Sequence, residues 1–294
     1  MNKPAVAAVN ITKVNAASVE VTHDLLAAEE PLEIRIGYGA RAERRQRSIS
    51  VTMRTPGHDF ELAIGFLFTE GIIGNTSAIE TIKYCADLHT HEDLRNIVRV
   101  ELKEGILVDE KKLQRNFYAT SSCGVCGKAS IESIQSICEV TTESMPIHLT
   151  RDLILSLPEK LRQHQKVFEY TGGLHACALF DTSGNLELLR EDVGRHNALD
   201  KLIGAGITKY VSTEKEKLSS FILLLSGRVS FELVQKAAMA GIKVICAIGA
   251  PSGLAVQTAK EFGITLIGFL RDLRFNIYSN EQRIVLDNKF AAIT

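Results

Sequence analysis

The stretch from Phe221 to Phe269, FILLLSGRVSFELVQKAAMAGIKVICAIGAPSGLAVQTAKEFGITLIGF, decides the fold class of this chain. It contains three apolar runs, at residues 221–225, 242–248 and 264–269, with helical segments between them that end near Ala240 and Glu261. Continuous apolar strands that alternate with helices are typical of a parallel sheet that is covered on both faces. We therefore predict an α/β domain in the second half of the chain.

Right-handed crossovers place the loops that follow such strands at one edge of the sheet, where α/β proteins bind ligands. The segments Ser226–Ser230 and Gly249–Gly253 and the residues after Phe269 fall at this edge. Two of them lead into helix N-termini, which favour anions, and arginines at 228, 271 and 274 suit phosphate. Neither of these two loops has a P-loop or dinucleotide-binding fingerprint, so ordinary tight turns explain them as well.

Upstream of this region we predict strands at 174–180 and 185–190, then a helix over 195–203. The segment Glu191–Lys201, EDVGRHNALDK, lies between a strand and this helix and is dense in charge. Its His196 and Asn197 could converge on a ligand. Alternatively, the segment is a charged helix start with Asp192 as its cap and Arg195 as its ion-pair partner. His175 could be a structural histidine or an acid–base residue at the same edge.

The first half of the chain has a different periodicity. Residues 32–38 and 48–53 alternate between apolar and polar, which predicts half-buried antiparallel strands. The basic turn 41–47 between them is either a solvated loop or a docking site for an anionic ligand. A helix is predicted from Asp59, with an apolar face of Leu62, Ala63, Phe66 and Leu67 and an end at Gly71, and a strand at 97–102.

A Cys-x-x-Cys pair, Cys123 and Cys126, lies in a glycine-flanked loop just before a predicted helix. The helix dipole and Lys128 both favour a thiolate, the form that attacks sulfur or binds metal. The pair could serve redox chemistry, sulfur relay or half a zinc site, or have no function. Zinc needs about four ligands and no second such pair exists, so we predict no structural zinc. The isolated cysteines are predicted to be core residues: Cys85, Cys138, Cys177 and Cys246.

Composition sets broad limits on the function. The 294 residues are 45% hydrophobic and 23% charged, with a formal net charge of -1. Nothing in this balance points to nucleic acid or to an anionic membrane. Six cysteines without a secretory signal favour reduced thiols and a cytoplasmic location, and no apolar run is long enough for a transmembrane helix.

Several of these segments together resemble one family, the formate dehydrogenase accessory sulfurtransferases (FdhD family). The similarity begins near residue 30, and the charged segment 191–201 is its most specific part. The other segments that carry it are Thr55–Gly57, Gly65–Gly71, Cys123–Gly127, Thr171–Ala176, Ser226–Ser230, Ala250–Ser252 and Gly268–Arg271.

The resemblance implies a cytidine-deaminase-like three-layer α/β domain with a smaller N-terminal α+β domain. We expect a disordered leader over 1–28, the smaller domain over 29–120, the Cys-x-x-Cys loop and a linking helix over 121–145, and the α/β domain over 146–294. The family is usually dimeric, so a homodimer is also expected. The zinc deaminases of that fold carry an H-x-E sequence that this chain lacks.

The implied function is sulfur transfer. A cysteine desulfurase donates sulfur to Cys123 as a persulfide, and Cys126 assists. The sulfur passes to the molybdenum or tungsten bis-guanine-dinucleotide pterin cofactor, a client that is not permanently bound, before insertion into formate dehydrogenase. The candidate cofactor contacts are Phe269, Leu270, Arg271, Asp272, Leu273, Arg274, Ser226, Gly227, Arg228, His196, Asn197 and His175. Rival functions are a cofactor chaperone without sulfur chemistry, a zinc-dependent hydrolase or deaminase, and a dithiol oxidoreductase.

Overall fold

The computed structural model describes residues 4–85, 95–109, 147–211 and 218–286, which form two compact units. Unit 1 takes the described residues up to 109 together with 165–176 and 190–205. Unit 2 takes the described parts of 147–164, 177–189 and 206–286. The division therefore differs from the expected boundary at residue 146, because two later segments join the N-terminal unit. The expected linking segment 121–145 lies outside the described residues.

Unit 1 is built on a four-stranded sheet in the order β4-β3-β6-β5. β3 pairs antiparallel with β4 and parallel with β6, and β5 pairs antiparallel with β6. The predicted strands at 32–38, 48–53 and 97–102 are confirmed, whereas β5 was not predicted. The strands are β3 (Glu30–Tyr38), β4 (Arg45–Arg54), β5 (Ile79–Tyr84) and β6 (Ile97–Leu102), with short 3-10 turns η1 (Arg41–Glu43) and η2 (Thr76–Ala78).

One helix of unit 1, α1 (Asp59–Thr69), packs against β6. It starts and ends where the sequence predicts, and Gly71 has the positive φ of 66° expected after a helix. Of its predicted apolar face, Leu62, Ala63 and Leu67 are buried, while Phe66 is only partly buried. The residue before the helix, His58, adopts a left-handed conformation with φ 57°, which is uncommon for a residue other than glycine.

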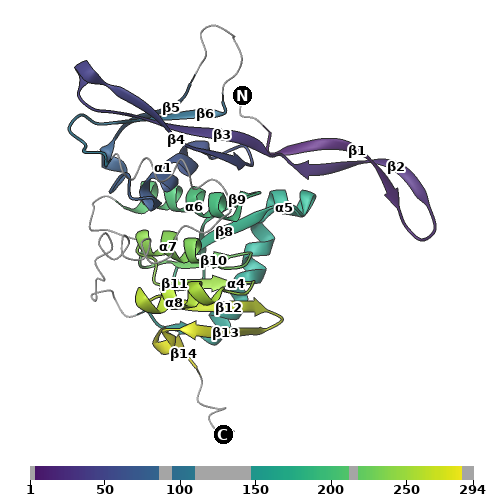
Figure 1. Ribbon diagram of the computed structural model, residues 1–294. Helices are drawn as coiled ribbons and strands as arrows, with labels where there is room; N and C mark the ends of the chain where they lie inside the picture. Colours follow the sequence, from purple (N-terminus) through teal and green to yellow (C-terminus); the bar gives the residue numbers. More distant parts are fainter. Residues whose placement is uncertain (1–3, 86–94, 110–146, 212–217, 287–294) are drawn as a thin grey trace. The chain divides into compact units, whose positions relative to one another are not determined.

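The predicted disordered leader over 1–28 is wrong, because residues 6–27 form a β-hairpin (Figure 1). β1 (Val6–Val14) and β2 (Val19–Ala27) pair antiparallel as a separate two-stranded sheet. β1 contains three valines, an isoleucine and a threonine, and β2 contains two valines and a threonine, which are β-branched residues that favour extended backbone. The turn is held by Asn15, whose Oδ1 accepts hydrogen bonds from the Ala17 and Ser18 amides at 2.8 Å each. β2 contacts α5 (Lys166–Thr171), which also belongs to unit 1.

A six-stranded sheet in the order β13-β12-β11-β10-β8-β9 forms the core of unit 2. The central strands β10, β11 and β12 are parallel, as predicted, but β8 and β13 join antiparallel, so the sheet is mixed rather than wholly parallel. The strands are β8 (His175–Phe180), β9 (Leu186–Asp192), β10 (Ile222–Leu225), β11 (Val244–Ala247), β12 (Thr265–Arg271) and β13 (Arg274–Ser279).

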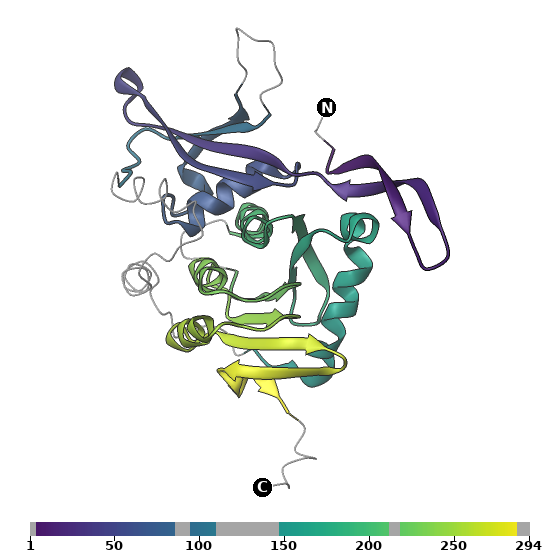
Figure 2. The same ribbon diagram turned by 45° about the vertical axis from the view of Figure 1, so that its right-hand side comes forward.

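Helices cover both faces of this sheet. Figure 2 shows α7 (Phe231–Met239) and α8 (Gly253–Glu261) on one face and α4 (Arg151–His164) on the other. α6 (Arg195–Tyr210) runs past its predicted end at Ile203, and its residues are shared between the two units. The remaining elements are β7 (Leu149–Thr150), which pairs with β14 (Ile284–Val285), and the turn η3 (Glu281–Arg283). In the described part of the chain, no helix is both long and apolar enough to cross a membrane.

Candidate functional site

The carboxyl edge of the parallel strands in unit 2 brings the three predicted loops together. The Gly249 amide donates to the carbonyl oxygen of Gly227 at 3.1 Å, and the Phe269 amide donates to the carbonyl oxygen of Gly249 at 3.1 Å. The Val229 amide donates to Ala250 O at 3.1 Å, and the Ser252 amide donates to Val229 O at 2.9 Å. A continuous chain of backbone bonds therefore links the ends of β10, β11 and β12, and the predicted clustering of these loops is confirmed.

Two glycines allow this close approach of backbone. A Cβ at Gly249 would lie 2.7 Å from Gly227 O and 2.8 Å from Arg228 N. A Cβ at Gly268 would lie 2.8 Å from Pro251 Cδ. Such separations are too short for a side chain when the neighbours are backbone or a rigid ring, so this edge requires glycine at both positions.

The segment after Phe269 is not a strand-to-helix loop. β12 continues to Arg271 and returns as β13 through a two-residue turn, Asp272–Leu273, in which both residues have positive φ (53° and 55°). Phe269 also has a positive φ of 53°, next to an irregularity in the pairing of β12 with β13. Positive φ at bulky residues costs roughly 1–3 kcal/mol each and collects at functional sites.

This edge presents positive charge to solvent. Arg228, Arg271 and Arg274 are exposed, and Arg271 lies over the Phe269 ring at 5.9 Å from its centroid. Leu273 at the tip of the turn is 85% exposed, whereas the side chain of Leu270 is buried in the core. The edge loops can therefore offer guanidinium groups and backbone amides to an anionic ligand, and Leu270 can contribute only its backbone.

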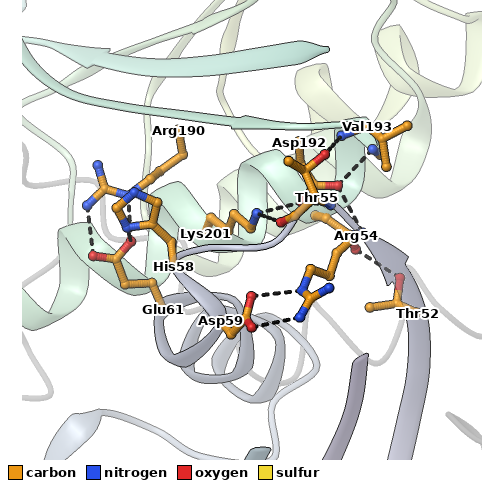
Figure 3. A network of polar contacts seen from close by, with 12 residues as sticks. Thr52, Arg54, Thr55, His58, Asp59, Glu61, Arg190, Asp192, Val193 and Lys201 are labelled. Carbon is orange, nitrogen blue, oxygen red and sulfur yellow. Dashed lines mark hydrogen bonds and ion pairs between the residues drawn. The ribbon is translucent and has the colours of Figure 1, made fainter. Parts of the chain in front are cut away.

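The charged segment 191–201 lies in unit 1, where its side chains bond to the end of β4 and the start of α1 (Figure 3). The buried Lys201 Nζ lies 2.6 Å from Asp192 Oδ2 and donates to the Thr55 carbonyl oxygen at 2.7 Å. The same carboxylate oxygen accepts from the Thr55 amide at 3.1 Å, and Oδ1 accepts from the Gly194 amide at 2.8 Å. The bond from Gly194 precedes the first helical residue of α6, Arg195, so it closes a local turn and does not show the predicted helix cap. Lys201 is an ion-pair partner of Asp192 that the sequence interpretation did not name.

Asn197, a predicted cofactor contact, is buried in this network. Its Nδ2 donates to Met53 O at 2.7 Å and to Asp192 Oδ1 at 3.3 Å, while its Oδ1 accepts from the Thr52 hydroxyl at 3.1 Å. Its amide is therefore engaged by the protein on both sides. His175 is half-buried at the start of β8, and its pKa is lowered first by burial and then by the positive charge of Arg195. His196 is partly buried near the start of α6.

A second set of charges in unit 1 was not singled out from the sequence. Arg54, fully buried, makes a two-pronged ion pair with Asp59, with both N–O distances 2.9 Å, and the Tyr84 hydroxyl donates to the same carboxylate at 3.2 Å. Glu61 accepts from Arg190 Nη2 at 2.7 Å and lies 3.1 Å from His58 Nδ1. The local sequence signal was limited to His58, Asp59 and Glu61, which follow Thr55-Pro56-Gly57.

Three of the six cysteines, Cys85, Cys177 and Cys246, lie in the described part of the chain. Cys177 and Cys246 are buried, as predicted, and burial raises the pKa of Cys246 to about 12. Cys85 is only partly buried, which departs from the predicted core position. Cys123, Cys126 and Cys138 lie outside the described residues. Within the described ranges, no group of three or more His, Cys, Asp or Glu side chains is placed to hold a metal ion.

The carboxyl edge of the sheet and the charged segment at the start of α6 both lie within one stretch that matches a single protein family. The chain belongs to the FdhD/NarQ family, which it matches over residues 27–285.

Among its relatives are proteins named sulfur carrier protein FdhD. That of Streptomyces avermitilis is 45% identical over 278 residues, covering 94% of each chain. That of Mycolicibacterium paratuberculosis is 46% identical over 275 residues, covering 93% of this chain and 97% of the other. A crystal structure from Desulfotalea psychrophila, described as a formate dehydrogenase accessory protein, superposes with a TM-score of 0.70 at 22% identity. It covers 96% of this chain and 100% of its own, and it supports the fold alone.

Proposed function

We propose that this protein is a sulfurtransferase that supplies sulfur to a molybdenum or tungsten bis-guanine-dinucleotide cofactor and so activates a formate dehydrogenase. The observation that carries the proposal is family membership, with relatives at 45% and 46% identity that are named sulfur carriers. The Cys-x-x-Cys pair at 123 and 126 is the part of the sequence best suited to carry sulfur.

The first step is persulfide transfer. The Cys123 thiolate attacks the outer sulfur of a persulfide on a cysteine desulfurase. The sulfur–sulfur bond of the donor breaks, the desulfurase cysteine leaves as a thiolate, and Cys123 becomes Cys–S–SH. We place this chemistry in the reducing cytoplasm, where thiols are kept in the form that this transfer needs.

Release of the sulfur uses the second cysteine. The Cys126 thiolate attacks the inner sulfur of the Cys123 persulfide, which forms a Cys123–Cys126 disulfide and expels the outer sulfur as hydrosulfide. Two electrons pass from the two cysteines to the departing sulfur, so a cellular thiol reductant must restore the pair before the next cycle. Hydrosulfide is a soft ligand and suits the metal of the client cofactor.

The client cofactor carries pyrophosphates and guanines, and we propose that the carboxyl-edge loops of unit 2 bind this end of it. The exposed guanidinium groups of Arg228, Arg271 and Arg274 can form paired hydrogen bonds to phosphate oxygens. The strained backbone at Phe269 and at Asp272–Leu273 supports the same assignment. Asn197 is better suited to hold the start of α6 in place than to contact the ligand, since its amide already bonds to the protein.

The proposed partners are a cysteine desulfurase, a formate dehydrogenase and a second copy of this chain. The proposal is tested in cells that lack this protein, by restoring formate dehydrogenase activity with variants. Cys123→Ala should abolish activity, and Cys126→Ala should reduce it less completely because external thiols can release the sulfur. Cys85→Ala is the matched control and should restore full activity. Full activity of Cys123→Ala would instead favour a cofactor chaperone without sulfur chemistry.

A further inference from the structure

Among the described strands, β1 pairs with β2 alone, so none of them occupies the outer edge of β1. β1 pairs with β2 through its whole length, from Val6 opposite Ala27 to Val14 opposite Val19, and the two form a separate two-stranded sheet. A two-stranded ribbon alone is marginally stable in water, and an unpaired edge is a template for another strand. Figure 1 shows the ribbon extending past the four-stranded sheet of its own unit.

The hydrogen bonds at the two ends of the hairpin show which residues face the free edge of β1. At the turn, the Asn15 amide donates to Ser18 O at 3.0 Å, and at the base the Ala28 amide donates to Ala5 O at 2.9 Å. Residues 5 and 15 therefore bond toward β2, and the register between them has no bulge. Since bonding residues alternate along an antiparallel strand, the even-numbered residues point their N–H and C=O groups outward. These are Val6, Ala8, Asn10, Thr12 and Val14.

Several features that protect edge strands from pairing are missing from β1. It carries no proline and no bulge, and none of its five outward-bonding residues is charged. The only charged residue of β1 is Lys13, which bonds toward β2 and lies opposite Glu20. The two strands differ in their surroundings, because β2 contacts α5 within unit 1.

We propose that β1 pairs antiparallel with β1 of a second copy of this chain, with a two-fold axis at Asn10. This register uses the full length of both strands. It places Val6 opposite Val14 and Ala8 opposite Thr12 of the partner subunit. Each residue whose N–H and C=O groups point outward is then opposite a residue of the other copy whose groups also point outward. About ten backbone hydrogen bonds then join two hairpins into one four-stranded sheet.

Two further features favour a second copy over an unrelated strand. Under this symmetry Lys13 faces Ala7, so no like charges oppose each other, and the pairs Val6–Val14 are β-branched cross-strand pairs that stabilise sheets. A self-complementary patch of this kind is what a two-fold dimer requires. The inference rests on the proposed self-association and is independent of sulfur transfer.

The test uses opposite charges at the two-fold axis. Sedimentation velocity of the full chain should show a dimer, and Asn10→Lys and Asn10→Asp should each weaken dimerisation at least tenfold, because each variant places like charges face to face. An equimolar mixture of the two variants should recover the dimer. The matched controls are His23→Lys and His23→Asp, since His23 lies opposite Asn10 but on β2, one strand farther from the axis.

Circular dichroism and thermal unfolding establish that each variant folds. A wild-type chain that remains monomeric, or Asn10 variants as dimeric as the wild type, would overturn the proposal. The proposal would also be overturned if an equimolar mixture of the two Asn10 variants dimerised no more tightly than either variant alone, because the two-fold axis would then not lie at Asn10. The persulfide chemistry of Cys123 does not enter any of these measurements.

Discussion

Replacing Lys201 with methionine should lower the free energy of unfolding by about 3 kcal/mol, near the low end of the roughly 3–5 kcal/mol for breaking a buried ion pair. Lys201 and Asp192 are both fully buried, and their Nζ–Oδ2 distance is 2.6 Å. Methionine has a similar length, so the main loss is electrostatic: the Asp192 carboxylate stays buried without its counter-charge. The amides of Thr55 and Gly194, at 3.1 and 2.8 Å, still donate to it and limit the loss.

Urea unfolding of the wild type, Lys201→Met, Asp192→Asn and the double variant measures this directly. The double variant should be more stable than Lys201→Met by at least about 1 kcal/mol, because neutralising Asp192 removes the uncompensated charge. Lys209→Met is the control on the same helix, at a side chain that is 55% exposed, and should change stability by less than about 0.5 kcal/mol. A cost below about 1 kcal/mol for Lys201→Met would refute the reasoning that Asp192 depends on Lys201 as its buried counter-charge.

Three further predictions follow from the same structure. Gly204→Ala should lower the free energy of unfolding by more than about 4 kcal/mol or prevent folding, because a Cβ there would overlap the Glu61 carbonyl oxygen. Gly253→Ala is the control and should leave stability unchanged, because a Cβ there meets nothing within 4 Å. Equal stabilities of the two variants in thermal unfolding would contradict this prediction. Burial raises the pKa of Glu61, but hydrogen bonds from Arg190 and His58 outweigh burial and lower it to about 2. The ionised Glu61 therefore contributes its full stabilisation above pH 4.5 and loses it as the pH falls toward 2. Over that range the free energy of unfolding should fall by roughly 3 kcal/mol more in the wild type than in Glu61→Gln. Parallel acid-unfolding curves for the two proteins would contradict this prediction. Arg228→Ala should weaken GDP binding ten- to a hundredfold by calorimetry, and unchanged affinity in both Arg228→Ala and Arg271→Ala would place the nucleotide site on another surface.

The parallel core of unit 2 could be predicted because its strands are continuous apolar runs. Runs of this length that alternate with helices are typical of buried parallel strands. β13 could not be predicted, because Leu273 occupies the second position of the turn, where glycine normally marks a turn with positive φ. The hairpin of β1 and β2 was missed for a different reason: most of its residues are exposed, so its alternation does not separate a buried face from a solvent face.

The charged segment 191–201 shows where sequence reasoning about the site stops. Its density of polar side chains was a valid signal, but the partners of Asp192, Asn197 and Lys201 come from residues 52–55, more than a hundred positions away in the chain. Proximity of that kind is set by the tertiary fold, and nothing local in the sequence records it. The clustering of loops at the carboxyl edge of unit 2 was easier to predict, since strand order and crossover handedness alone bring these loops together.

The central claim is that Cys123 carries sulfur, and intact-mass spectrometry tests it most directly. The protein is incubated with a cysteine desulfurase and cysteine, then measured without reductant and digested for peptide sequencing. We predict a gain of one sulfur atom on the peptide that contains residues 123–126, lost on treatment with a thiol and absent in Cys123→Ala. Extra sulfur found only at Cys85, Cys138, Cys177 or Cys246, or no gain at all, would contradict the account.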